Sequence, residues 1–301
     1  MDIPTSTMQL SGGIQIAYTI LGSSLLGRVR PIVLVPGMSV VKHDWRRISV
    51  SLATRRPVLI YDLRGMGEST CSDAAIEDIS IETLARDLLS LITHLGWSDI
   101  ALCGWSLGGV IVQQLLVLPY HASRPTPLPF RVSHVFLIST RSVVLKPNQH
   151  RLQQIKPASG NRPRTLAERR VIVRDILKQA FDPAWLQANQ VRFENIVDNH
   201  LPQSRPLPVI AKQQRAALTF DFEKLLPKIP RETKVGVIHG ELDQMIPFSA
   251  GLDIIHRIPS ARLLEQGHRP GQLPTYNFGH QWFDYFDDNL WVNVFEGFMK
   301  A

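Results

Sequence analysis

A serine lies between two glycines in the run Gly104-Trp105-Ser106-Leu107-Gly108, after an apolar segment and before a helical pattern. This spacing predicts a sharp strand-to-helix turn that presents the serine hydroxyl above the edge of a sheet. A hydroxyl presented in this way attacks a carbonyl carbon when a base removes its proton. We therefore predict that Ser106 is a nucleophile.

A serine nucleophile needs a base, and the base needs an acid that orients it. A carboxylate follows the apolar segment 234–238, in the run His239-Gly240-Glu241-Leu242-Asp243. Open parallel sheets carry functional groups in the loops that follow strand ends. We predict that Asp243 is the orienting acid, with Glu241 as its rival.

Two Gly-His pairs near the C-terminus supply the candidate bases, His268 and His280. A catalytic histidine must be held firmly while it accepts a proton and becomes charged. Aromatic residues and a final helical pattern follow His280, whereas a Pro-Gly loop follows His268. We favour His280 as the base and keep His268 as the alternative.

The oxygen of an attacked carbonyl becomes negatively charged and needs two backbone N–H donors. One donor is predicted at Leu107, which follows the nucleophile at the start of a helix. The other is predicted at Met38, in the turn after the apolar segment 31–35. Met38 and Trp105 are also predicted to line an apolar substrate pocket.

Short apolar segments alternate with helical patterns through most of the chain, which predicts an α/β fold with a parallel sheet covered on both faces. Residues 141–230 break this rhythm, because they are helix-rich, basic and punctuated by proline. We therefore predict a core made of residues 1–140 and 231–301. Residues 141–230 are predicted to form a helical cap inserted after the sixth strand.

The net charge of +7 is concentrated in one part of the chain, because residues 141–175 hold nine Lys or Arg against two acidic residues. We favour a solvated helix face there, and the alternatives are attraction of an anionic substrate, an acidic carrier protein or a membrane surface. No aromatic residues interleave with these charges, which argues against nucleic-acid binding. The first ten residues lack the pattern of a signal peptide, so we expect a cytoplasmic protein without stable membrane insertion.

Five segments together resemble the α/β-hydrolase fold family: VPGMS, DLRGMGES, GWSLGG, HGELDQMIP and GHQWFDYF. The resemblance covers nearly all of the chain except the predicted cap. It implies an eight-stranded, mostly parallel sheet, a triad of Ser106, Asp243 and a histidine, no cofactor and no metal. The chain departs from the family in its long loop 267–279 and in Pro36-Gly37, where the family has His-Gly. The aromatic-rich C-terminal loop is similar to that of fungal hydrolases of specialised metabolism.

These observations predict a serine hydrolase that acts on an ester, thioester or lactone of a small to medium apolar substrate. A serine at position 106 favours acyl transfer, whereas an aspartate there would indicate epoxide or haloalkane chemistry. Two alternatives stay open. One is a biosynthetic lyase, cyclase or carbon–carbon bond hydrolase of polyketide-type metabolism, and the other is a ligand receptor on the same scaffold. The sequence does not specify the substrate or the oligomeric state.

Overall fold

The computed structural model of this 301-residue chain describes residues 4–146 and 165–300. One sheet has the strand order β1-β2-β4-β3-β5-β6-β7-β8. β2 pairs antiparallel with β1 and β4, and all other neighbours in the sheet are parallel. The predicted fold class is thus confirmed. The strands are β1 (Ser6–Leu10), β2 (Ile14–Leu21), β3 (Ile32–Val35), β4 (Val58–Tyr61), β5 (Asp99–Trp105), β6 (Arg131–Ile138), β7 (Lys234–Ile238) and β8 (Ala261–Leu263).

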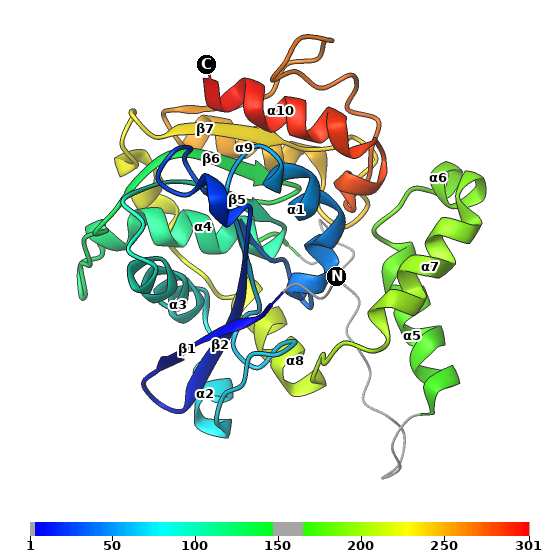
Figure 1. Cartoon of the computed structure of the whole chain (residues 1–301), viewed down its shortest axis with the longest axis horizontal. Coiled ribbons are helices and arrows are strands. Elements are labelled where there is room, and N and C mark those ends of the chain that lie inside the picture. The colour runs from blue at the N-terminus through cyan, green and yellow to red at the C-terminus, as the bar shows by residue number, and fades with distance from the viewer. Residues whose placement is uncertain (1–3, 147–164, 301) are drawn as a thin grey trace.

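Helices cover both faces of the sheet, and this explains why the central strands are apolar throughout rather than alternating. Every residue of β3 and β4 is buried. The helices α1 (Arg46–Ala53) and α10 (Asp288–Lys300) pack on one face. The helices α3 (Ile81–His94), α4 (Leu107–Val117) and α9 (Phe248–Arg257) pack on the other. Figure 1 shows α1 and α10 on one side of the sheet and α3 and α4 on the other.

Helices fill the described part of the chain between β6 and β7. They are α5 (Leu166–Lys178), α6 (Pro183–Ala188), α7 (Gln190–His200) and α8 (Leu207–Ala217). In Figure 1, α5, α6 and α7 stand together beside the sheet and its covering helices. We call these three the inserted helices. They have a small hydrophobic cluster of their own, in which Phe181 stacks on Trp185 with ring centroids 4.1 Å apart.

The fourth helix of this interval, α8, packs differently from the inserted helices. Val209 and Ile210 of α8 belong to the main hydrophobic cluster, which also contains α3 and α4. Phe222 and Leu226, farther along the chain, join the same cluster. The second half of the predicted cap therefore packs against the sheet layer, although the cap boundaries of 141–230 stay a prediction.

The basic residues of the stretch 141–175 differ in their burial and in their partners. Arg170 and Arg174 form ion pairs with Glu194 of α7, whereas Arg141 is buried. Binding of an acidic carrier protein to this stretch stays a prediction. In the described part of the chain, no helix combines the length and apolar character needed to cross a membrane. Four basic residues of the stretch lie outside the described residues: Arg151, Lys156, Arg162 and Arg164.

Candidate active site

Ser106 lies at the junction of β5 and α4, where the chain turns sharply. Its backbone φ of 56° is in the left-handed region, which is costly for a residue with a side chain. A Cβ atom on Gly104 would lie 2.6 Å from the carbonyl oxygen of Gly108. A Cβ atom on Gly108 would overlap the carbonyl oxygen of Val35. Glycine at both positions therefore allows the turn that presents Ser106.

Hydrogen bonds from the neighbouring strand hold the strained turn in place. The N–H of Ser106 donates to the carbonyl oxygen of Ile138 at 2.9 Å, and the hydroxyl of Thr140 donates to the carbonyl oxygen of Ser106 at 2.6 Å. Ser39 and Ser139, which follow β3 and β6, also have positive φ values. Strained non-glycine residues thus gather at the carboxyl edge of the sheet, as is common at functional sites.

Asp243 and His280 meet at this edge, although 37 residues separate them in the sequence. The Nδ1–H of His280 donates to Oδ2 of Asp243 at 2.8 Å. The other carboxylate oxygen accepts the backbone N–H groups of Met245 and Ile246, both at 2.9 Å. Both side chains are buried. The arrangement fixes the orientation of the imidazole and directs its Nε2 away from the carboxylate.

A second histidine, His239, also lies against Asp243. Its Nε2 is 3.0 Å from the carbonyl oxygen of Ile246 and 3.4 Å from Oδ2 of Asp243. Burial by itself raises the pKa of Asp243, but His280 and His239 hold that pKa well below its usual range. Asp243 is therefore ionised at neutral pH and able to stabilise a positive charge on His280.

The peptide group that joins His280 to Gln281 is held at both its carbonyl oxygen and its N–H. The indole N–H of Trp105 donates to the carbonyl oxygen of His280 at 3.0 Å. On the far side, the N–H of Gln281 donates to the carbonyl oxygen of Ala180, which follows α5, at 3.0 Å. Sequence reasoning assigned Trp105 only to the pocket and missed this bond, because an indole partner 175 residues away has no local signal.

Tyr285 joins the loop that carries His280 to the inserted helices. Its hydroxyl donates to Oδ2 of Asp182 at 2.8 Å and accepts the N–H of Asp182 at 2.9 Å. The Tyr285 hydroxyl also lies close to Gly279, the residue before His280. Burial is the main cause that raises the pKa of Tyr285 far above its usual range, so the hydroxyl stays protonated. The sequence marked Tyr285 for aromatic packing and gave no sign of these bonds.

The two rival residues lie elsewhere. His268 is exposed in its loop, and it is not among the residues that line the cavity described below. Glu241 is exposed, although its backbone N–H donates to the carbonyl oxygen of Tyr276. The structure thus brings His280, and not His268, to Asp243. In residues 4–146 and 165–300, no group of three or more His, Cys, Asp or Glu side chains is placed to hold a metal ion.

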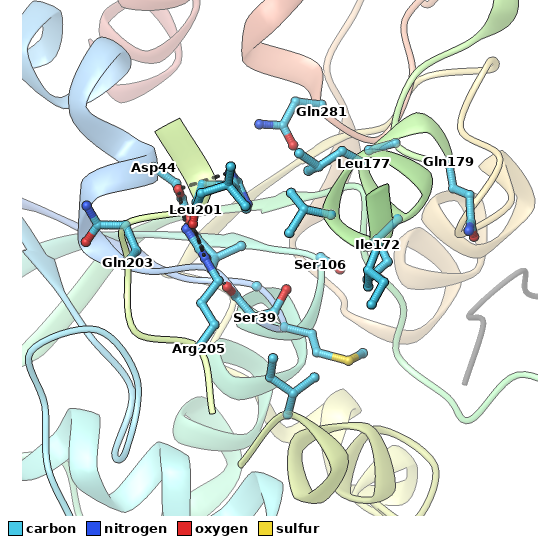
Figure 2. A pocket seen from close by; sticks show the side chains of 18 of the residues that line it. Ser39, Asp44, Ser106, Ile172, Leu177, Gln179, Leu201, Gln203, Arg205 and Gln281 are labelled. Carbon is cyan, nitrogen blue, oxygen red and sulfur yellow. Dashed lines mark hydrogen bonds and ion pairs between the residues drawn. The ribbon is translucent and has the colours of Figure 1, made fainter. Parts of the chain in front are cut away.

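A cavity of about 750 Å³ opens in front of Ser106. Ser106 and His280 both line it, and no hydrogen bond joins their side chains in the described residues. Met38 and Trp105, the predicted pocket residues, also line the cavity. Figure 2 shows Ser106 facing the space between Ile172 and Leu177 of α5 and the loop that carries Ser39.

The two predicted oxyanion donors flank Ser106. Leu107 is the first residue of α4, so its N–H has no acceptor within the helix. Met38 lies in the turn after β3, next to Gly37. A Cβ atom on Gly37 would lie 3.2 Å from Cβ of Ser106, so this turn passes close to the serine. The assignment of Met38 and Leu107 as donors to an oxyanion stays a prediction.

An ion pair whose side chains are only 9% and 10% exposed forms another part of the cavity wall, and no pattern in the sequence indicated it. Arg205 donates to Asp44 at 2.8 Å and 3.1 Å and to the carbonyl oxygen of Ser39 (Figure 2). Burial by itself raises the pKa of Asp44, but His200 and Arg205 hold it below its usual value. Burial is the main cause that lowers the pKa of His200.

Comparisons with known proteins agree with this architecture. The model of the "Alpha/beta hydrolase family" matches residues 32–276. The soluble epoxide hydrolase of Corynebacterium sp. (strain C12) is 25% identical over 150 residues, which are 44% of this chain and only half of that enzyme. The crystal structure of a hydrolase from Pseudomonas aeruginosa PA01 has a TM-score of 0.72 at 23% identity and covers 99% of this chain and 98% of its own.

A second solved structure, the enol-lactonase from Burkholderia xenovorans LB400, also has a TM-score of 0.72, at 20% identity. The match covers 98% of this chain and 100% of that enzyme. At such identities, the two structural likenesses establish the fold and leave the substrate open.

Proposed function

Because this chain belongs to the alpha/beta hydrolase family, we propose that it is a serine hydrolase for an ester, thioester or lactone of a small to medium apolar substrate. Ser106 is the nucleophile, His280 the base and Asp243 the orienting acid. One observation carries the proposal: the hydrogen bond of 2.8 Å between His280 and Asp243 lies beside the cavity that Ser106 lines.

The reaction proceeds through an acyl-enzyme. Oγ of Ser106 attacks the acyl carbon while Nε2 of His280 takes the hydroxyl proton. The N–H groups of Met38 and Leu107 stabilise the negative oxygen of the tetrahedral intermediate. Its collapse expels the alcohol or thiol, which receives the proton from His280. Water then attacks the acyl carbon with His280 again as base, which releases the acid and restores Ser106.

The lining of the cavity supports an apolar substrate. Ile172 and Leu177 of α5 and Ile210 of α8 contribute aliphatic surface. In this proposal the inserted helices form a cap over the acyl or alcohol portion. A serine at position 106 favours acyl transfer over epoxide opening, which uses a carboxylate nucleophile. The likeness to an enol-lactonase keeps lactones among the candidate substrates.

Hydrolysis of p-nitrophenyl acyl esters of increasing chain length tests the proposal. Ser106→Ala and His280→Ala are each expected to lower kcat by a factor on the order of 10³ or more. His268→Ala is the matched control, because this exposed histidine is not among the residues that line the cavity. Labelling by a fluorophosphonate probe is expected in the wild type and absent in Ser106→Ala.

The two rival functions give different results in the same experiment. A receptor would bind its ligand without turnover of any ester. A lyase or cyclase would leave simple esters intact and convert a polyketide-type substrate without adding water. If His268→Ala abolished turnover while His280→Ala did not, the assignment of the base to His280 would be wrong.

A further inference from the structure

One face of α5 forms a continuous side of the cavity. Arg169, Ile172, Val173, Ile176 and Leu177 all line it, at the spacing of residues that share one helix face. The C-terminal end of α5 lies at the histidine loop, because Ala180 bonds Gln281 there. At 1.5 Å per residue, Arg169 lies about 12 Å along the helix from Leu177. The face thus begins as apolar surface near His280 and ends in a guanidinium.

Arg169 differs from the other charged groups of the cavity. Asp44 and Arg205 pair with each other, and His280 bonds Asp243. Arg169 has no ion pair or side-chain hydrogen bond with any residue in 4–146 or 165–300. Residues 147–164 contain no Asp or Glu. The only charge that lines the cavity without a partner is therefore positive, within the described part of the chain.

The neighbours of Arg169 show that the lack of a partner is specific to this side chain. Arg170 bonds Glu194 and Asp198, both at 2.8 Å, on the side of α5 that packs against α7. Glu168 accepts the N–H of Thr165 and so caps the start of α5. Arg170 and Glu168 thus have partners of their own, whereas Arg169 lines the mouth of the cavity as an exposed residue.

We propose that Arg169 binds a carboxylate at the end of the substrate's apolar portion, remote from the bond that is cleaved. This inference rests on the proposed function and narrows its substrate class to esters, thioesters or lactones with a distal anionic group. The planar guanidinium suits a carboxylate, with which it forms paired hydrogen bonds. The apolar face of α5 between Arg169 and Leu177 accommodates the chain that separates the two ends.

Pairs of p-nitrophenyl esters test the proposal. In each pair the acyl chain ends either in a carboxylate or in a neutral carboxamide of the same length. The wild type is expected to prefer the carboxylate once the chain is long enough to reach Arg169. Arg169→Gln is expected to raise KM for that ester about 10-fold, with kcat unchanged, because the contact is equal in ground and transition states. The carboxamide ester is expected to change less than about twofold.

Arg170→Gln is the matched control, since it removes an adjacent arginine that is already paired and does not line the cavity. It is expected to leave the preference for the carboxylate intact. Raised ionic strength is expected to weaken the preference in the wild type and not in Arg169→Gln. Equal kcat/KM for both esters at every chain length, or an equal loss in Arg170→Gln, would overturn the inference.

Calorimetric binding separates this inference from the proposed function. The Ser106→Ala protein, which cannot form an acyl-enzyme, is titrated with the same two esters, with and without Arg169→Gln. A carboxylate preference that disappears with Arg169→Gln supports the inference even if the wild type proves unable to hydrolyse any ester. Equal affinity for the two esters in the Ser106→Ala protein refutes it, even if the wild type is an active hydrolase.

Discussion

The sheet core and the inserted helices use charged residues in opposite ways. In the core, Arg64 forms two hydrogen bonds of 2.6 Å with Asp87, and their side chains are only 5% and 7% exposed. In the inserted helices, Arg170 and Glu194 form a pair at 2.8 Å with exposures of 37% and 32%. Buried pairs enforce one geometry because an unpaired charge there is costly, whereas exposed pairs tolerate change.

The core and the inserted helices contribute different parts of the candidate site. The core supplies Ser106 and Asp243 from the ends of strands that are buried on both faces. The inserted helices supply the apolar face of α5 and Arg169. The two regions meet at the loop of His280, where Ala180 accepts the N–H of Gln281 and Asp182 bonds the hydroxyl of Tyr285. Substitutions in the two regions should therefore differ in kind as well as in size.

The largest expected effect is the loss of catalysis when a residue of the core is substituted. Asp243→Asn removes the charge that stabilises protonated His280, and we expect kcat to fall by roughly 10⁴-fold. Steady-state hydrolysis of a p-nitrophenyl ester measures this loss. A kcat within tenfold of wild type would contradict the role of Asp243.

The free energy of unfolding of Asp243→Asn should also depend on pH differently from that of the wild type. The pKa of Asp243 is depressed in the folded chain, so its ionised form stabilises the fold at pH values above the unfolded pKa of about 3.9. That contribution is lost as the pH falls through the folded pKa. The difference in free energy of unfolding between wild type and Asp243→Asn should therefore be constant above about pH 5 and shrink below pH 4. Urea denaturation across this range measures it.

The second largest effect concerns the buried pair of the core. Arg64→Met leaves Asp87 buried without its partner, and we expect a loss of about 3–5 kcal/mol in the free energy of unfolding. Burial already raises the pKa of Asp87 despite its bonds to Arg64. The double variant Arg64→Met/Asp87→Leu should recover most of this loss, as measured by urea denaturation. No recovery would show that packing, rather than the unpaired charge, causes the effect.

A smaller effect is expected where the two regions meet. Tyr285→Phe removes the hydroxyl that bonds Asp182 and lies close to Gly279, and His280 is then held less precisely. We expect kcat to fall about 10-fold while KM stays unchanged for short and long acyl esters alike. Tyr276→Phe is the matched control, because its hydroxyl donates to the carbonyl oxygen of Leu264 and not to Asp182. Equal losses in both variants would refute a positioning role for Tyr285.

The smallest effect is expected in the inserted helices. Glu194→Gln removes an ion-pair partner that Arg170 and Arg174 share, yet all three side chains are about one-third exposed or more. We expect no measurable shift in the urea midpoint at physiological salt, because water and ions screen such pairs. A shift as large as that of Arg64→Met would remove the contrast between the two regions.

Local patterns in the sequence were sufficient for most of the fold. The apolar segment 31–35 and the Gly-x-Ser-x-Gly run predicted β3 and the junction of β5 and α4, because burial and backbone crowding act on neighbouring residues. The helix α1 begins only at Arg46, since a 3-10 turn occupies Lys42–Trp45. The packing of α8 against the main core was not predicted, because its amphipathic pattern does not identify its partner.

The sequence by itself determined the sheet, the sharp turn at Ser106 and the two candidate histidines, since each depends on residues that are close along the chain. Only the tertiary structure decided which histidine bonds Asp243, and which arginine in the described part of the basic stretch lines the cavity. Those outcomes depend on long loops and on contacts between distant segments. A sequence pattern lists the groups that can pair, and the packed chain selects the pairs that form.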